Sequence, residues 1–362
     1  MIRCFTKTDN ETKLVIWLLQ VQKLSTTPTL DTFLQYEPHG TVLIFGAWNY
    51  PFHLTMYPFM NALAAGNTVL LKMPEMAPNT SKLMKKLIEK YLDNRCYHAI
   101  IGGVDVSTTL LSLKFDVIFF TGSTRIGKIV YQAAAKFCTP CALELGGKNP
   151  VYIDDSADLL MTMRRILFGK MNAGQLCAAP DYILCTKDVQ EEVVKKARVV
   201  LKEFYGDDPL KSEYMTGIVN QHHFDRLTKM LDGCTPAVGG RVLKEKRIIE
   251  PTIVTNADPD GPLMKDEIFG PIIPIVVVKD VQEAVDFINK RPKSLQLYVF
   301  TTNSEVVQKF LNETSSGSLG INDTVMTMVA VTLPFGGVGE SGFGAYHGQA
   351  GFECFSNPKK VS

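Results

Sequence analysis

One cysteine of the chain lies in a stretch whose composition suits nucleophilic catalysis. Cys177 belongs to the run GKMNAGQLCAAPDY, with small residues beside it and a proline soon after. Gly174 and Pro180 interrupt regular backbone, so we expect Cys177 on an ordered loop or a helix end, where a substrate can reach the sulfur. A thiolate there could attack an electrophilic carbon. The alternative is an inert thiol, because free cysteine is usually a buried, small hydrophobic residue.

Two further residues could assist such a nucleophile. Glu144 lies near the end of the expected strand 142–145, which a Gly-Gly-Lys run follows directly. In a crevice, partial burial would raise the pKa of its carboxyl toward a value that suits a general base, whereas the alternative is a solvated charge at a strand end. Asn49, in the run WNYP between a strand and a helix, could donate a hydrogen bond to a developing oxyanion. Its alternative role is to cap the following helix.

The run TGSTRIGK, from Thr121 to Lys128, follows an expected strand and opens a helix. Glycines in such a turn let the backbone approach a ligand, and the N-terminus of the helix favours a phosphate. The spacing of Gly122 and Gly127 matches neither the usual dinucleotide fingerprint nor a Walker loop. The stretch therefore indicates either a phosphate site or an ordinary helix start.

Other polar residues suit sugar contacts. Lys72 and Glu75 follow an expected strand and could bond ribose hydroxyls, although a solvated loop is the commoner setting for such charges. Glu267 and Phe269 combine an acid and an aromatic ring at a turn, which is compatible with a sugar contact but is not diagnostic.

A Cys-x-x-Cys pair at Cys138 and Cys141 offers a rival redox or zinc site. The sequence has no second such pair, and its six histidines show no matching ligand spacing. The pair also lies between an expected helix end and a strand, whereas a thioredoxin-like site lies at a strand-to-helix junction. We therefore expect no metal site.

These residues lie in an alternating series of strands and helices that must position them. The alternation predicts parallel sheets covered by helices on both faces. Two such series meet near Glu144–Pro150, and ligands of open α/β sheets bind at the carboxyl ends of strands, so we expect a cleft close to Glu144 and Cys177. The expected helices are 10–24, 52–65, 79–92, 106–113, 128–137, 157–171, 189–204, 221–231, 281–289 and 304–312; the expected strands are 41–45, 68–72, 97–101, 115–120, 142–145, 151–153, 182–185, 249–254, 273–278, 295–301 and 318–322.

Length and composition describe an ordinary globular chain. With 362 residues, the chain exceeds the size at which one core usually stops growing, so two domains are expected. The formal net charge of +1 gives no reason to expect nucleic acid as a partner. No apolar run is long enough to span a bilayer, and the N-terminus has no secretory signal pattern. The eight cysteines show no disulfide framework, so we expect reduced thiols and a cytoplasmic location.

Taken together, these stretches resemble the aldehyde dehydrogenase superfamily, and most closely its class 3 branch. The resemblance runs in the order of the family from about Glu37 to Phe355. The matching stretches are EPHGTVLIFGAWNYPF, AGNTVLLK, FDVIFFTGSTRIGK, LELGGKNPVYID, GQLCAAPDYILC, DEIFGPI, ETSSGSLGIND and LPFGGVGESGFGAYHG.

The resemblance implies a role for each matched residue. Cys177 would be the nucleophile, Glu144 the base that activates water, and Asn49 an oxyanion donor beside the Cys177 amide. Lys72 and Glu75 would contact the adenosine ribose. The remaining cofactor contacts would be Gly122, Ser123, Thr124, Gly127, Gly146, Glu267 and Phe269.

The resemblance also implies a fold of two open, doubly wound α/β domains with a small oligomerisation element. We expect a dinucleotide-binding domain over 1–145, a catalytic domain over 146–317, and a C-terminal oligomerisation strand and tail over 318–362. The cofactor would be NAD, with NADP as the alternative. The substrate would be a small apolar aldehyde, and the partner a second copy of the chain in a homodimer.

Three departures from the family pattern leave other functions open. The part before residue 37 is short, the segment from Gly169 to Cys177 is one residue shorter than the pattern, and the proline between Lys72 and Glu75 is shifted. These departures favour, as the alternative, a catalytically impaired fragment or pseudoenzyme with a binding role. A CoA-acylating relative is a third hypothesis, against which the water-activating Glu144 argues.

Overall fold

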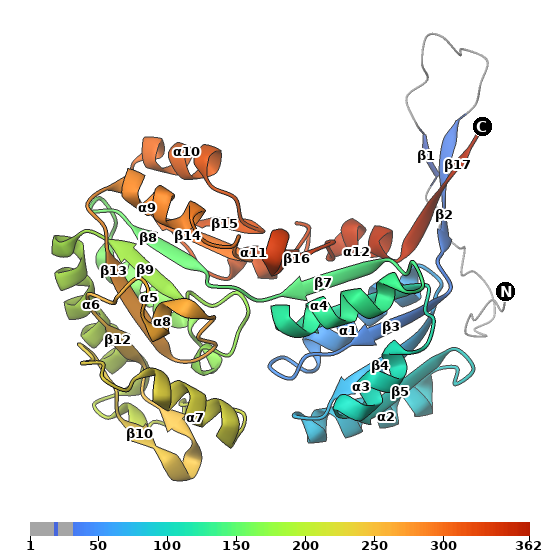
Figure 1. Ribbon diagram of the computed structural model, residues 1–362, viewed down its shortest axis with the longest axis horizontal. Coiled ribbons are helices and arrows are strands. Elements are labelled where there is room, and N and C mark those ends of the chain that lie inside the picture. Colours follow the sequence, from blue (N-terminus) through green and yellow to red (C-terminus); the bar gives the residue numbers. More distant parts are fainter. Residues whose placement is uncertain (1–17, 21–31) are drawn as a thin grey trace. The chain divides into compact units, whose positions relative to one another are not determined.

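The computed structural model describes residues 18–20 and 32–362, which form two compact units (Figure 1). The first unit holds the described residues up to Glu144 together with 331–334 and 343–362. The second holds 145–330 and 335–342. Each unit is built on one six-stranded sheet.

The sheet of the first unit has the strand order β16-β7-β6-β3-β4-β5, and β3 pairs in parallel with both β4 and β6. Parallel strands need crossover connections, which the helices between them supply. The strands are β3 (Thr41–Phe45), β4 (Thr68–Pro74), β5 (Tyr97–Gly102), β6 (Val117–Gly122), β7 (Cys141–Leu145) and β16 (Gly342–Phe343); the helices are α1 (His53–Ala64), α2 (Pro78–Tyr91), α3 (Val104–Leu111), α4 (Thr124–Ala135) and α12 (Gly348–Cys354).

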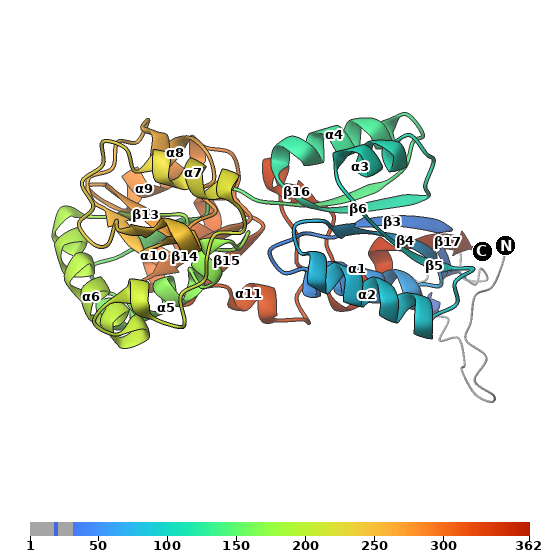
Figure 2. The ribbon, with the colours of Figure 1, turned by 90° about the horizontal axis from the view of Figure 1, so that it is seen from below.

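Helices cover both faces of this sheet. Figure 2 shows α3 and α4 on one face and α1 and α2 on the other. The central strand β3 is accordingly apolar along its length, and Val42, Leu43 and Ile44 are completely buried. A continuous apolar run is what a strand buried on both faces requires.

A small antiparallel sheet completes the first unit, with the strand order β1-β2-β17. Its strands are β1 (Leu18–Gln20), β2 (Phe33–Pro38) and β17 (Ser356–Val361). The helix predicted over 10–24 is therefore wrong at Leu18–Gln20, where pairing with β2 overrides the local periodicity. The rest of that prediction lies outside the described residues. The oligomerisation role expected of the C-terminal strand stays a prediction.

The sheet of the second unit is parallel, with the strand order β12-β13-β9-β8-β14-β15. A short hairpin of β10 (Val242–Leu243) and β11 (Ile248–Ile249) lies outside it. The sheet strands are β8 (Pro150–Ile153), β9 (Tyr182–Cys185), β12 (Thr252–Val254), β13 (Ile272–Val277), β14 (Gln296–Phe300) and β15 (Ser318–Ile321); the α-helices are α5 (Leu159–Gly169), α6 (Lys187–Tyr205), α7 (Gln221–Met230), α8 (Pro262–Lys265), α9 (Val281–Asn289), α10 (Ser304–Glu313) and α11 (Met326–Val329).

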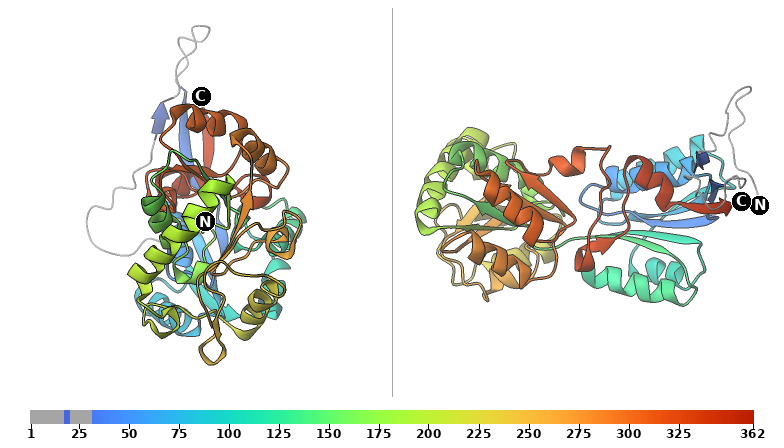
Figure 3. Two further views of the ribbon diagram at one scale, coloured as in Figure 1. Left: turned by 90° about the vertical axis from the view of Figure 1, so that its left-hand side faces the viewer. Right: turned by 90° about the horizontal axis from the view of Figure 1, so that it is seen from above.

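Two hydrophobic cores lie on opposite faces of this second sheet. Along β14, Tyr298 and Phe300 pack into the core that α5 and α6 cover, whereas Leu297 and Val299 pack into the core that α9 and α10 cover. The alternation follows from the period of two of a strand. The same two layers of helices can be followed in Figure 3.

The structure confirms the predicted α/β class with parallel, doubly covered sheets. Two local predictions are wrong. The strand expected over 249–254 is split into β11 and β12 around Glu250 and Pro251, because proline cannot donate to a sheet ladder. The helix expected from Lys128 begins at Thr124, so Gly127 lies inside α4.

Two findings bear on the cellular setting. No helix among the described residues is long and apolar enough to cross a membrane. Among the cysteines that the structure describes, six are free thiols and Cys96 is disulfide-bonded, so the expectation of reduced thiols is wrong at Cys96. The cytoplasmic location stays a prediction.

Candidate active site

Cys177 lies on a turn between α5 and β9, as the sequence predicts. After α5 ends at Gly169, three successive residues, Asn172, Ala173 and Gly174, have positive φ angles of 55°, 53° and 69°. The chain turns over this left-handed stretch between α5 and β9. The β9 strand then starts in register with β8 at Pro150.

The Cys177 side chain is half-buried between fully buried neighbours, and its thiol is not in a disulfide. Cys177 is thus neither a core residue nor a fully exposed surface residue. The partial exposure is compatible with a nucleophile and argues against the alternative of an inert buried cysteine.

Side chains of the sheet hold three successive carbonyl groups of the turn. Asn149, completely buried before β8, donates its amide to the oxygens of Cys177 at 2.7 Å and Ala179 at 2.9 Å. The Tyr298 hydroxyl donates to the intervening Ala178 oxygen at 2.6 Å. The Asn149 oxygen accepts from the backbone N–H of Gln296 at 2.9 Å. These bonds fix the backbone on which the thiol is mounted.

Sequence reasoning missed both Asn149 and Tyr298. One signal was available for Asn149: an amide at the start of an apolar strand must have its bonds satisfied, because a buried amide without partners is costly. Nothing comparable identifies Tyr298, since an aromatic residue in a buried strand is ordinary.

Glu144 is 4% exposed, so the alternative of a solvated strand-end charge is wrong. Neither of its carboxyl oxygens has a hydrogen-bond partner among the described residues. Burial holds the pKa of this carboxyl well above its ordinary value, as general-base catalysis near neutral pH requires. Burial, with an added contribution from Glu144, raises the pKa of the Cys354 thiol to about 12.

Glu267 lies against the Gly146-Gly147 turn of the second unit. A Cβ atom at Gly146 would come within 2.1 Å of the Glu267 Oε2 atom, so a larger residue there would displace the Glu267 carboxyl. The N–H of Gly147 donates to the same carboxylate. Desolvation, followed by the charge of Asp181, raises the pKa of Glu267 to about 8. A carboxyl in this state could donate a hydrogen bond as well as accept one.

A buried ion pair holds the segment that carries Glu267 and Phe269. The ammonium of Lys148 contacts the Asp181 carboxylate and donates to the Leu263 oxygen at 2.8 Å. Asp181 accepts from the N–H of Ile268 at 3.0 Å. The side chains of Lys148 and Asp181 are only 11% and 4% exposed, so this pair is a structural clamp and not a surface contact.

In the first unit, the carboxyl ends of β3, β4 and β6 lie side by side, because Phe45 is in register with both Lys72 and Phe120. Lys72 is 7% exposed, so a solvated loop is the wrong setting for it, and it pairs with Glu75 at 2.6 Å. Gly122 ends β6 directly before α4.

Two observations test whether these residues fit a dinucleotide. A Cβ atom at Gly122 would meet the Phe120 ring at 2.6 Å, so a larger residue in the turn before α4 would displace that ring. The Thr121 hydroxyl is buried without a hydrogen-bond partner among the described residues. This unpartnered Thr121 hydroxyl, the glycine turn and the N-terminus of the twelve-residue helix α4 together suit a phosphate group. The residues therefore fit NAD or NADP.

Asn49 lies in the bend between β3 and α1. The N-cap of α1 is Phe52, whose side chain makes no capping hydrogen bond, and the alternative role of Asn49 as a cap stays open. The oxyanion role stays a prediction.

The Cys-x-x-Cys pair shows no sign of redox or metal chemistry. Cys138 is exposed, and burial raises the pKa of the Cys141 thiol to about 11, which disfavours the reactive thiolate. The described residues contain no cluster of three or more histidine, cysteine or acidic side chains that could hold a metal ion.

A glycine turn that suits a phosphate in one doubly wound sheet, and a partly exposed cysteine on a braced turn in the other, suit an α/β enzyme that uses a nucleotide and a cysteine nucleophile. The model of the aldehyde dehydrogenase family matches residues 12–361. The chain belongs to that family.

Individual relatives and solved structures agree with this family assignment. The chain is 49% identical to "Aldehyde dehydrogenase, dimeric NADP-preferring" of Mus musculus, over 93% of this chain and 75% of that protein. It is 48% identical to "Aldehyde dehydrogenase family 3 member A2" of Pongo abelii, over 94% and 70%. The substrate-bound state of AldH from Staphylococcus aureus gives a TM-score of 0.93 at 41% identity, over 96% and 76%. An aldehyde dehydrogenase of Mycobacterium tuberculosis complexed with NAD+ gives 0.85 at 28%, over 95% and 72%.

These comparisons confirm the predicted family and, with it, the enzyme class of an NAD(P)-dependent aldehyde dehydrogenase. The predicted site residues fall in both units. Cys177, Gly146, Glu267 and Phe269 belong to the second unit. The predicted residues of the first unit are Asn49, Lys72, Glu75, Gly122, Ser123, Thr124, Gly127 and Glu144. The convergence of Cys177, Glu144 and Asn49 on one carbonyl stays a prediction, as do the roles assigned to the domains.

Proposed function

We propose that the chain oxidises aldehydes to carboxylic acids with NAD(P)+ through a thioester on Cys177. The observation that carries this proposal is the accessible thiol of Cys177 on a turn whose carbonyls are held by Asn149 and Tyr298. A nucleophile mounted on fixed backbone loses little entropy on reaching its reactive geometry.

In this mechanism the Cys177 thiolate adds to the aldehyde carbon, and the carbonyl oxygen becomes an oxyanion. The amide of Asn49 and the backbone N–H of Cys177 would donate to that oxygen, where one donor is worth about 3 kcal/mol. Bound NAD(P)+ would supply the hydride acceptor, and the residues that would hold it are those that the resemblance assigns to the cofactor, from Lys72 to Phe269. Loss of hydride leaves the acyl group on the sulfur as a thioester.

Glu144 would complete the cycle by taking a proton from the water that attacks the thioester. The acid then leaves, and the Cys177 thiolate is restored. The raised pKa of Glu144, which burial causes, makes it a stronger base than an ordinary carboxylate.

The finer assignments rest on the relatives. A relative is named NADP-preferring and dimeric, so we extend NADP use and a homodimer to this chain. We also propose an apolar aldehyde as the substrate. Nothing in the structure or the comparisons supports a pseudoenzyme or a CoA-acylating enzyme.

The test is NAD(P)H formation by the purified chain with an aldehyde series such as hexanal, dodecanal and benzaldehyde. Cys177→Ala should reduce the rate to background, whereas Cys138→Ala, at an exposed thiol, should leave it unchanged. Turnover that persists in Cys177→Ala would rule out the mechanism. An inactive wild-type chain that still binds NAD+ in calorimetry would favour a binding role.

A further inference from the structure

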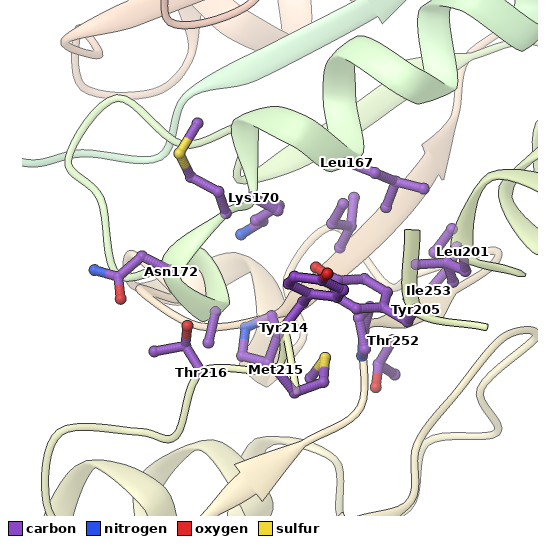
Figure 4. Close-up of a pocket in the computed structure, with 15 residues that line it drawn as sticks. Leu167, Lys170, Asn172, Leu201, Tyr205, Tyr214, Met215, Thr216, Thr252 and Ile253 are labelled. Atoms are coloured by element: carbon purple, nitrogen blue, oxygen red, sulfur yellow. The ribbon is translucent and has the colours of Figure 1, made fainter. Parts of the chain in front are cut away.

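A cavity of about 80 Å³ lies in the second unit beside the segment that leads to Cys177 (Figure 4). Its walls come from the ends of α5 and α6 and from β12 and β13. Leu167, Leu201, Ile253 and Ile273 make these walls apolar, and all four are buried. The cavity reaches solvent beside Tyr214, which is 74% exposed.

One charged side chain, that of Lys170, lies among the residues that line the cavity. It is 6% exposed, and its Nζ donates to the Gly270 oxygen at 2.9 Å. No carboxylate pairs with it in the part of the chain that the structure describes. Figure 4 shows Lys170 gathered at the cavity with Tyr205 and Tyr214.

The surroundings keep much of this amine uncharged. Desolvation lowers the pKa of Lys170 to about 8; the charges of Asp181 and Glu267 oppose the shift, and that of Lys148 adds to it. Near neutral pH a much larger share of Lys170 side chains is therefore neutral than of ordinary lysines. A neutral amine is a nucleophile toward carbonyl compounds.

The reaction open to it is condensation with an aldehyde. The amine nitrogen adds to the carbonyl carbon, and the carbinolamine expels its oxygen as water to leave a carbon–nitrogen double bond. Once protonated, the imine nitrogen keeps one N–H, which can still donate to the Gly270 oxygen. No oxidant or reductant is needed, and hydrolysis reverses the step.

We propose that Lys170 and this cavity form a second aldehyde site, where short-chain aldehydes are held reversibly as imines. The volume of about 80 Å³ sets the size limit, because one water needs roughly 10–15 Å³ of such space and the cavity therefore holds about six heavy atoms. Acetaldehyde and propanal fit, whereas a long alkyl aldehyde does not. The site needs the chain to meet aldehydes, but it does not need Cys177 to oxidise them.

The captured aldehyde would lie close to the catalytic turn. The backbone oxygen of Lys170 accepts from the N–H of Gly174 at 2.8 Å, and the chain then runs directly to Cys177. Occupancy of the cavity therefore acts on the residues that set the position of the thiol.

The experiment traps the imine with sodium cyanoborohydride at pH 7.5 in the presence of propanal and maps the alkylated lysines by peptide mass spectrometry. Lys195 is the internal control, because it is exposed and its ion pair with Glu192 raises its pKa. Lys170 should be labelled at least about tenfold faster than Lys195. Dodecanal should label Lys195 but not Lys170.

Labelling of Lys170 no faster than that of Lys195, or equal labelling of Lys170 by propanal and dodecanal, would overturn the proposal. Cys177→Ala separates this proposal from the proposed function. Lys170 should be labelled at the same rate in Cys177→Ala as in the wild type. Labelling of Lys170 in the wild type but not in Cys177→Ala would overturn the proposal, because the capture would then depend on Cys177. An inactive wild-type chain with labelled Lys170 would contradict only the proposed function.

Discussion

The side-chain amide of Asn149 donates a hydrogen bond to the backbone oxygen of Cys177 at 2.7 Å. The buried amide also bonds Ala179 and Gln296, so one side chain joins the nucleophile turn to two strands of the sheet. The position of the thiol is thereby set by the core of the second unit and not by the turn alone.

Asn149→Ala should destabilise the second unit by about 3–5 kcal/mol. The change leaves two carbonyl groups and one N–H of the core without partners, at about 1–3 kcal/mol each before relaxation. The measurement is urea unfolding, together with the rate at which iodoacetamide alkylates Cys177, which should change in the variant. Tyr298→Phe, which removes a single bond, is the milder test, at about 1–2 kcal/mol.

Asn303→Ala is the matched control, because this exposed asparagine only caps α10 through the N–H of Glu305. Its loss should cost about 1 kcal/mol and leave the alkylation of Cys177 unchanged. Equal costs at Asn149 and Asn303 would show that the buried amide does not brace the turn.

Gly174→Ala should be more damaging than an ordinary glycine substitution. Gly174 has a φ of +69°, and a Cβ atom there would come within 2.1 Å of the Gly270 oxygen, which is backbone and cannot rotate away. Gly233, with a φ of +77° and nothing within 4 Å, carries the same conformational strain without the clash. We expect Gly233→Ala to cost about 1 kcal/mol and Gly174→Ala at least about 2 kcal/mol more. Thermal unfolding of the two variants measures the difference, and similar melting temperatures would count against this packing.

Features of the fold and the site that depend on neighbouring residues could be predicted from the sequence, whereas contacts between residues far apart in the chain could not. The alternation of apolar runs and helix patterns predicted the strands at 41–45 and 182–185 to the residue. A strand that is buried on both faces is a continuous apolar run, which can be recognised from the local sequence alone. The network around Cys177 could not be predicted. Asn149 and Gln296 lie 147 residues apart, and only the parallel pairing of β8 with β14 brings them together. The pattern likewise predicted Glu267 as a sugar contact, but not the ion pair that holds its segment.

Breaking the Lys148–Asp181 pair from either side should cost about 3–5 kcal/mol, because each single change leaves a buried charge uncompensated. Lys148→Met combined with Asp181→Asn should cost less than the sum of the two single changes. The single variants should also raise the KM for NAD(P)+, since the segment that carries Glu267 loses its clamp. A double-mutant cycle by chemical denaturation gives the coupling energy.

The exposed pair of Lys309 and Glu313 on α10 provides the reference for that cycle. Its coupling should be at most about 0.5 kcal/mol. A coupling for Lys148 and Asp181 that is no larger would mean that the buried pair does not hold the segment.

The free energy of unfolding should depend on pH in the way that a carboxyl buried in its neutral form requires. The pKa of Glu144 is raised on folding, so between about pH 4.5 and the raised value the folded state binds the proton and the unfolded state does not. Stability from this group is fully present below pH 4.5 and is lost as pH rises through that window. Relative to Glu144→Gln, the wild type should lose about 1.4 kcal/mol per pH unit. Glu192→Gln should show no such slope from pH 5 to 8, because the pKa of that carboxyl is lowered.

The titration of Glu144 should also appear in catalysis, where rising pH increases the rate although it lowers the stability. Only ionised Glu144 can take a proton from water, so the rate of thioester hydrolysis should rise with pH up to the raised pKa and then level off. Glu144→Gln should complete hydride transfer once and then stall, which stopped-flow measurement of NAD(P)H detects as a burst without a steady state. The neutral amide keeps the size of the side chain but cannot act as a base. Steady turnover by this variant at the wild-type rate would remove Glu144 from the mechanism, because the hydrolytic proton would then go elsewhere.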